Sequence, residues 1–329
     1  MLVAARMHGL RLLVCSVSLA STCFGQPAQP PVENAVTLSL ERPAVVGMPV
    51  WLSVSAIGRG VTYPLDIRPA GFWCDEVEVR RDGRMLPRIA SLETQAFDGI
   101  VTGGMMCGSL GLPSATRHQG RIPLHLQYRF DQPGAYEVRY SFHKDWPSKG
   151  PPTIQSAWTR IDIQPGGPQD RARWLAEMSA QAPPGTTDLL TDFLPSILGV
   201  PDAASFQLLL PYLYHPDNLV RQFAMFGLTY WPVQEAADSV MQLVRTRGPS
   251  DVGVRFLVRG AKSVVANSDS LIENAIPYLR SDSALQLQGA LAALQAVHFM
   301  NGLQAGQAAR TKAVDALIGA AEHGQLADG

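Results

Sequence analysis

The spacing of hydrophobic residues changes near residue 165 of this 329-residue chain. Before that point apolar and polar residues alternate in short runs, as in Val36 to Glu41 and in Tyr136 to Phe142. This pattern is typical of β-strands with one buried face. After Pro165-Gly166-Gly167-Pro168 the apolar residues recur with the period of a helix. The chain is long enough for about two domains, so we predict a β domain followed by a helical one.

Turn residues divide the first half into the short strands that an antiparallel sandwich needs. Arg121 to Phe130 and Tyr136 to Phe142 alternate on either side of Asp131-Gln132-Pro133-Gly134, which predicts a hairpin. The alternation places His125 on the polar, exposed face of this hairpin. A second hairpin is predicted where Asp82-Gly83 follows another alternating strand.

Two motifs of the first half resemble those of bacterial immunoglobulin-like domains. Val46-Gly47-Met48-Pro49-Val50 precedes an alternating strand, as at the opening of such domains. Asp131-x-x-Gly134-x-Tyr136 is similar to their tyrosine corner, in which the tyrosine hydroxyl hydrogen-bonds to nearby backbone. The resemblance implies an immunoglobulin-like (Ig-like) antiparallel β-sandwich.

A repeated pattern is the strongest internal signal of the second half. Pro-Tyr-Leu, a short polar break and four spaced residues occur twice, and the offset in sequence is the same for every matched pair. The matched pairs are Pro211 and Pro277, Tyr212 and Tyr278, Leu213 and Leu279, Leu219 and Leu285, Gln222 and Gln288, Ala224 and Ala290, and Leu228 and Leu294. Another helix pair is predicted between the copies, so the offset spans two repeats of about 33 residues each. The alternative is a chance match in a region rich in leucine and alanine.

The segment Leu219-Val220-Arg221-Gln222-Phe223-Ala224 resembles the second helix of HEAT-type repeats. The resemblance implies an α-solenoid, in which each helix pair buries its apolar face against its neighbours. It also implies binding or scaffolding and supplies no active site. The predicted fold class is therefore a multidomain β + α protein, an Ig-like antiparallel β-sandwich followed by a HEAT-like α-solenoid.

The first residues have the three parts of a secretory signal peptide. Arg6 and Arg11 supply a positive segment, Leu12 to Ala20 form an apolar run, and Cys23-Phe24-Gly25 puts small residues before the cleavage point. A transmembrane anchor is the alternative, but the run has about half of the roughly 20 residues that cross a bilayer. We therefore predict an exported protein, periplasmic or extracellular, with no membrane span after cleavage.

The predicted organisation has six segments. They are a signal peptide at 1–25, a flexible tether at 26–34, the Ig-like β-sandwich at 35–165, a linker with a short helix at 166–185, HEAT-like repeats at 186–322 and a tail at 323–329. The tether is rich in Gln and Pro, as flexible or extended linkers are.

Two of the four cysteines lie in the predicted signal peptide. In an oxidising compartment the other two, Cys74 and Cys107, are predicted to form a disulfide. This bond would pin the long Gly-rich stretch 92–119, which we interpret as an insertion in the sandwich. The alternative is a reactive thiol at Cys107, which with His118 and a nearby acid would make the stretch a hydrolase site.

No sequence motif supports catalysis, a metal site or a cofactor. Seven histidines are present, but none stands in His-Glu-x-x-His, and no Cys-x-x-Cys occurs. Ser141-Phe142-His143-Lys144 formally matches the Ser-x-x-Lys of penicillin-recognising enzymes, yet it is predicted to end a strand rather than to open a helix. We therefore predict no catalytic residues, no metal ligands and no cofactor.

Charge and aromatic residues bear on the kind of partner. A net charge of −1, with no Lys/Arg cluster, argues against nucleic-acid binding. The Ig-like sandwich and the helical repeats are both modules that mostly act by presenting surfaces to other molecules. Their combination predicts a non-catalytic binding or scaffold protein with a protein or peptide partner. The alternative is a carbohydrate-binding module on a helical spacer, with Trp73 and Trp146 facing the glycan.

Overall fold

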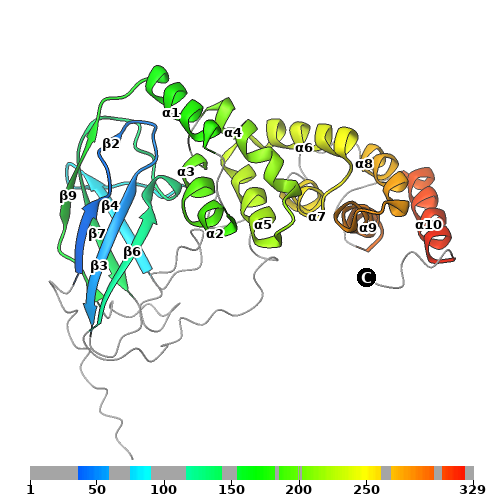
Figure 1. Ribbon diagram of the computed structural model, residues 1–329, viewed down its shortest axis with the longest axis horizontal. Helices are drawn as coiled ribbons and strands as arrows, with labels where there is room; N and C mark the ends of the chain where they lie inside the picture. The colour runs from blue at the N-terminus through cyan, green and yellow to red at the C-terminus, as the bar shows by residue number, and fades with distance from the viewer. Residues whose placement is uncertain are drawn as a thin grey trace, which may run out of the picture.

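The computed structural model describes two β-sheets and a row of helices that leads away from them (Figure 1). The described residues are 36–58, 75–89, 116–142, 154–181, 185–198, 200, 202–260, 268–299 and 306–322. The predicted signal peptide, tether, tail and Cys74–Cys107 disulfide lie outside them. We call residues 36–164 the β unit and residues 168–322 the helical array.

The β unit has two sheets, each built from strands that are distant in sequence. The first sheet has the order β1-β3-β6, with antiparallel neighbours. The second has the order β2-β9-β7-β4-β5; β8 pairs with β7, and β2 runs parallel to β9. The strands are β1 Val36–Leu40, β2 Ala44–Val45, β3 Trp51–Gly58, β4 Asp75–Arg81, β5 Arg84–Met85, β6 Thr116–Pro123, β7 Gly134–Phe142, β8 Ile154–Gln155 and β9 Thr159–Gln164.

The two sheets share one hydrophobic core. In β7, Tyr136, Val138 and Tyr140 are buried in this core, while Glu137 and Arg139 alternate with them on the other face. Side chains of β1 and β3 reach the same core from the first sheet. Because burying a large apolar side chain contributes about 2 kcal/mol, the alternation predicted from the sequence fixes which face of β7 turns inward.

The predicted hairpin around Pro133-Gly134 is wrong. β6 ends at Pro123, and Leu124–Leu126 form a short 3-10 turn, η2. β6 pairs with β3 in the first sheet and β7 pairs with β4 and β9 in the second, so the chain crosses between the sheets here. The alternation of buried and exposed side chains does not continue through this turn. Leu124 packs in the core of the β unit, whereas Leu126 packs in the core of the helical array.

The second predicted hairpin is confirmed. β4 and β5 are antiparallel, with Arg81 opposite Arg84. Asp82 and Gly83 connect the two strands with positive φ angles of 50° and 75°. Glycine and aspartate tolerate this region of backbone space better than most residues, which is why the Asp-Gly pair predicts the turn correctly.

The tyrosine motif at the start of β7 makes the hydrogen bond that the sequence predicts. The Tyr136 hydroxyl donates to the carbonyl oxygen of Gln132 at 2.9 Å. Gly134, between them, has a φ of 132°, which other residues rarely adopt. Arg81 of β4 holds the same turn, since its guanidinium donates to the side-chain oxygen of Gln132 at 2.6 Å and to the carbonyl of Pro133 at 3.1 Å.

The helices of the array pack side by side in a row, and α10 lies farthest from the β unit (Figure 1). The elements are α1 Pro168–Ala180, α2 Thr186–Asp188, η3 Leu189–Phe193, α3 Leu194–Ile197, α4 Ala203–Leu209, η4 Leu210–Tyr214, α5 Asn218–Gly227, η5 Leu228–Tyr230, α6 Val233–Arg247, α7 Asp251–Arg255, η6 Phe256–Gly260, α8 Ser268–Ala275, η7 Ile276–Arg280, α9 Ala284–Phe299 and α10 Gln307–Glu322. None of the described helices combines the length and the apolar character that crossing a membrane requires.

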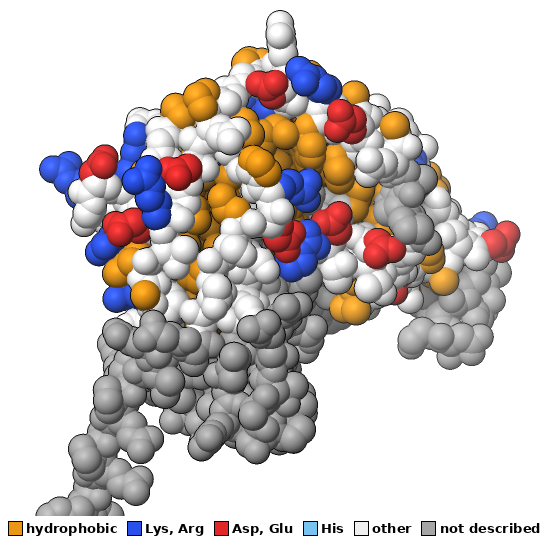
Figure 2. Space-filling view, turned by 60° about the vertical axis from the view of Figure 1, so that its left-hand side comes forward, with side chains coloured by type: hydrophobic (Ala, Val, Ile, Leu, Met, Phe, Trp, Pro, Cys, Tyr) orange, Lys and Arg blue, Asp and Glu red, His pale blue; other side chains and the backbone are white. Residues whose placement is uncertain are grey.

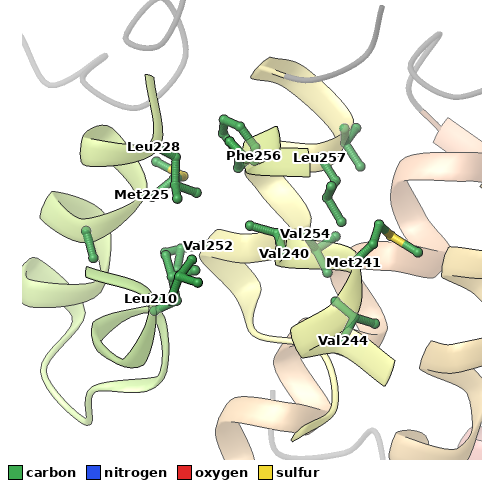
Figure 3. Packing of buried hydrophobic residues seen from close by; sticks show 14 of the residues in the cluster. Leu210, Met225, Leu228, Val240, Met241, Val244, Val252, Val254, Phe256 and Leu257 are labelled. Carbon is green, nitrogen blue, oxygen red and sulfur yellow. The ribbon is translucent and has the colours of Figure 1, made fainter. Parts of the chain in front are cut away.

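Helix starts in the array recur at a fixed interval. α5, α7 and α9 begin at Asn218, Asp251 and Ala284, which are equally spaced along the chain. Both Pro-Tyr-Leu copies form 3-10 turns, η4 and η7, directly after α4 and α8. Buried side chains of successive helices pack into one continuous core (Figure 3). The repeat length predicted from the sequence is therefore present in the helix boundaries.

Candidate functional site

Three successive turns of the array are joined to one another by hydrogen bonds and ring contacts. They follow η4, α6 and η7, and each leads into the next of the equally spaced helices α5, α7 and α9. The first two turns are joined at Gly248. The Tyr214 hydroxyl donates to the Gly248 carbonyl, and the Arg247 guanidinium lies 4.3 Å from the centre of the Tyr214 ring.

The third turn is joined to the second by ring packing and by a hydrogen bond. The Tyr278 ring packs against Gly248 so closely that an added Cβ would lie 2.5 Å from its Cε1. The Gln286 side-chain amide donates to the Arg247 carbonyl at 2.7 Å, and Ser281 donates to Gln286 at 2.6 Å. We call Tyr214, Arg247, Tyr278, Arg280 and Gln286 the turn ridge.

The turn ridge offers two tyrosine rings and two cationic groups, of which Arg247 is held against Tyr214. Burial raises the pKa of Tyr214 to about 12, so its hydroxyl stays a donor over the ordinary pH range. Arg247 and Arg280 are exposed, and Arg280 takes part in no ion pair within the described part of the chain. Tyrosine and arginine are the side chains that most often dominate protein–protein binding energies.

A buried ion pair fixes the helices behind the ridge. Arg221 of α5 is 6% exposed, and its Nε lies 3.1 Å from a carboxylate oxygen of Asp251 at the start of α7. The same guanidinium donates to the carbonyls of His215 and Pro216, both at 2.9 Å. A fully bonded buried arginine of this kind is structural, because its donors are already occupied.

The β unit and the helical array meet at a joint with several polar contacts. Trp51 donates from its indole nitrogen to the hydroxyl of Ser196 at 3.2 Å. Arg121 stacks 4.2 Å from the centre of the Trp51 ring and donates to Asp192 at 2.9 Å. From the array, the Tyr230 hydroxyl donates to the Leu126 carbonyl at 3.0 Å. Donor groups of both units therefore contribute to the contacts that hold the units together.

His125 lies in this joint, and its predicted exposure on a strand is wrong. The side chain is 6% exposed, because η2 turns it toward the array. Its Nδ1 accepts from the Val50 backbone N–H at 3.1 Å, and its Nε2 lies 2.7 Å from the Pro195 carbonyl, to which it donates. Burial lowers the pKa of His125 to about 4. The ring is therefore neutral near pH 7 and links the two units.

The outer face of the second sheet carries paired charges. Arg80 pairs with Glu137 at 2.7 Å and Arg139 with Glu78 at 2.6 Å. The Trp158 ring lies beside both arginines, with its centre 4.0 Å from one guanidinium carbon and 4.6 Å from the other. The two arginines of this face are thus each paired with a glutamate, and Trp158 is already in contact with both guanidinium groups.

On the face that Figure 2 draws, acidic and basic side chains also lie beside one another around a hydrophobic area.

A small pocket of about 60 Å³ lies next to His125. It is lined by Gly47, Met48, His125, Tyr128, Arg129, Phe130 and Asp131. This volume holds a few water molecules.

The structure describes only some of the residues weighed for chemistry. Ser141 lies in β7, as predicted, and is buried, and its hydroxyl accepts a hydrogen bond from the side-chain amide of Gln155. His118 lies in β6, opposite Ala56, but its side chain is outside the described part. Trp73, Trp146, Lys144 and the two cysteines Cys74 and Cys107 also lie outside it. Within the described residues no three His, Cys, Asp or Glu side chains gather as metal ligands.

Sequence reasoning singled out none of Tyr214, Arg247 and Gln286 as binding residues. The repeated tyrosine of the Pro-Tyr-Leu motif was the available signal, because Tyr278 is one of its two copies. Comparison of the chain with protein-family models, with curated proteins and with solved structures finds no match. The functional interpretation therefore rests on the residues of the ridge and the joint.

Proposed function

We propose that the protein is a non-catalytic, exported binding or scaffold protein that holds a peptide or protein partner on the turn ridge. The observation that carries this proposal is the bonding of three successive turns through Tyr214, Arg247, Tyr278 and Gln286. Because these contacts fix the side chains before any partner arrives, less conformational entropy is lost on binding. The exposed Arg247 then supplies a cation beside the Tyr214 ring, and Arg280 is a second exposed cation of the ridge.

The strand order supports an Ig-like sandwich as the fold of the β unit. If β1 and β2 are taken together as strand A, then β3, β4, β6, β7 and β9 correspond to strands B, C, E, F and G. The first sheet then reads A-B-E, and the second contains G-F-C with β5 as C′, as in Ig domains. The hydrogen bond from Tyr136 to Gln132 at the start of strand F fits the tyrosine corner of that fold.

The helix boundaries support HEAT-like repeats as the fold of the array. Equally spaced helix starts, with buried faces turned toward neighbouring helices, are what a stacked α-solenoid produces. Such solenoids present extended surfaces to proteins and peptides.

The export proposal rests on the N-terminal sequence pattern. Mass analysis of the protein from its native host tests it, with Gln26 expected as the first residue.

Peptide selection tests the binding proposal. The full mature chain is immobilised, a random peptide display library is passed over it, and the affinities of enriched peptides are measured by fluorescence anisotropy. Arg280→Glu reverses an exposed charge of the ridge, while Arg310→Glu makes the same change at an exposed residue of α10 that is not one of the ridge residues. We expect Arg280→Glu to weaken binding by about 10-fold, equivalent to about 1.4 kcal/mol, and Arg310→Glu by less than about 2-fold.

Two outcomes would overturn this proposal. Peptides that bind wild-type and Arg280→Glu chains equally well would move the binding surface elsewhere. A selection that enriches nothing above an unrelated immobilised protein would remove the peptide function altogether. Screening the same chain against a glycan array distinguishes the alternative, since retention of defined glycans in the absence of peptide binding favours the carbohydrate-binding module.

A further inference from the structure

The two units of the protein are joined without sharing one core. The buried hydrophobic residues form two separate clusters, and Leu126 is the described residue of the β unit that belongs to the cluster of the array. Polar contacts such as Trp51 with Ser196 and His125 with Pro195 cross between them. An interface of this type allows one unit to separate while both remain folded.

The hydrogen bonds of His125 require its neutral ring. The Val50 N–H donates to Nδ1, so this nitrogen carries no proton, while Nε2 keeps its proton for the Pro195 carbonyl. A second proton would go onto Nδ1, where it would face the N–H of Val50 and break that hydrogen bond. The Val50 carbonyl, 3.2 Å from Nδ1, already accepts from the Leu124 N–H at 2.9 Å.

The surroundings of the ring compensate a positive charge only in part, because the carbonyls of Pro195 and Val50 raise the pKa of His125 by less than burial lowers it. Arg42 adds a like charge, and burial is the larger cause of the low pKa of His125. Arg129 and Asp131 line the pocket beside the ring, but both are exposed to solvent. From the array the ring meets the Pro195 carbonyl, and the carboxylate of Asp192 is paired with Arg121.

Further groups meet the ring from β3 and from the turn after η2. The Trp51 ring packs edge-on with its centre 5.9 Å from that of His125, and Tyr128 lines the adjacent pocket. Tyr128 donates its hydroxyl to the Val77 carbonyl. None of the described carboxylates hydrogen-bonds to the His125 ring, so a charged imidazolium there has no counter-ion in direct contact.

We propose that His125 is an acid-sensitive latch, whose protonation releases the helical array from the β unit while both units stay folded. At neutral pH the latch is closed, because the neutral ring bridges Val50 and Pro195. In acid the proton is bound more tightly when the joint is open, since the ring then reaches water. Opening is therefore favoured by mild acid.

Hydrogen exchange of the full chain, followed by mass spectrometry, measures the opening of the joint. The peptides to follow contain residues 50–51 and 194–198, with peptides from β7 and α9 as internal references. Between pH 7 and pH 5 we expect protection of the joint peptides, corrected for the intrinsic exchange rate, to fall by about 20-fold. This figure follows from a pKa of about 4 in the closed joint and 6.5 in the open one. Protection in β7 and α9 is expected to stay constant.

Two variants distinguish the effect of protonating His125 from a general effect of acid on the protein. His125→Gln removes the titrating ring, and we expect it to abolish the pH dependence of the joint peptides. His215→Gln, in the turn after η4, removes a histidine outside the joint and is expected to leave that dependence unchanged. A joint response in wild type that matches the response of β7 and α9 would overturn the proposal, as would a response that persists in His125→Gln.

An NMR titration keeps the proposal testable if His125→Gln does not fold. Labelled wild-type protein reports the protonation state of the His125 ring directly from its nitrogen resonances. We expect a neutral ring with a proton on Nε2 at pH 6. A ring that is already doubly protonated at pH 6 would overturn the latch, because the charged form would then be compatible with the closed joint.

Discussion

The side chains of Asp217 and Ser250 cap two helices of the array at equivalent positions of successive repeats. Asp217 accepts from the backbone N–H of Leu219 at 2.8 Å, and Ser250 accepts from that of Gly253 at 3.2 Å. Equivalent caps start successive helices in the same register. This common register is what brings the turns of the ridge side by side.

Removing these caps is expected to destabilise the array. Ser250 is 1% exposed, so the N–H of Gly253 cannot turn to water once the hydroxyl is gone. We expect Ser250→Ala to lower the free energy of unfolding by about 1–2 kcal/mol, and Asp217→Ala by about 1 kcal/mol. Asp217→Asn keeps a side-chain acceptor and serves as the control. Urea unfolding measures all three, and an Asp217→Ala variant as stable as wild type would contradict the assignment.

Gly248, whose carbonyl accepts from Tyr214 of the turn ridge, has no room for a side chain. Its φ of 86° is unfavourable for other residues, and an added Cβ would lie 2.5 Å from Tyr278. Gly83, in the hairpin of the β unit, has a similar φ of 75° but no atom within 4 Å of the same position. We expect Gly248→Ala to cost about 3 kcal/mol and Gly83→Ala about 1 kcal/mol in thermal or urea unfolding. Equal costs would show that backbone conformation alone matters at Gly248.

Local patterns explain what could be predicted from the sequence. The alternation in β7 and the Asp-Gly turn at Asp82-Gly83 act over a few residues, and both are found in the structure. The repeat at Tyr212 and Tyr278 is also local, because each copy specifies its own 3-10 turn and the helix after it. Patterns of this type predict the structure of a single element from its own residues.

The joint and the ridge depend instead on residues far apart in sequence. His125 looked exposed because the alternation of its neighbours was extended through a segment that turns after Pro123. Its partner Pro195 is 70 residues away, and the Gly248 carbonyl that accepts from Tyr214 is 34 residues away. No local pattern in a single sequence predicts such pairs, because they depend on how whole elements pack against one another.

Stability is expected to depend on pH through His125. Its pKa in the folded protein, about 4, lies below the ordinary value of 6.5, so folding favours the neutral ring. The stabilisation is therefore complete above pH 6.5 and is lost as the pH falls toward 4, with a total of about 3 kcal/mol. Urea unfolding at stepped pH measures this loss, and the part due to His125 is the difference from His125→Gln. Parallel pH profiles of the two proteins would contradict the assignment.

The buried pair of Arg221 and Asp251 should couple more strongly than an exposed pair of the same array. Its side chains are 8% and 15% exposed, whereas those of Lys312 and Glu273, which lie 3.3 Å apart, are 61% and 59% exposed. Removing one member of the buried pair leaves its partner poorly solvated, but removing both relieves that penalty. We expect a double-mutant cycle with Arg221→Met and Asp251→Ala to give about 1–3 kcal/mol of coupling. The matched cycle with Lys312→Met and Glu273→Ala is expected to give less than about 0.5 kcal/mol. Similar coupling in the two cycles would mean that burial does not strengthen the link between α5 and α7.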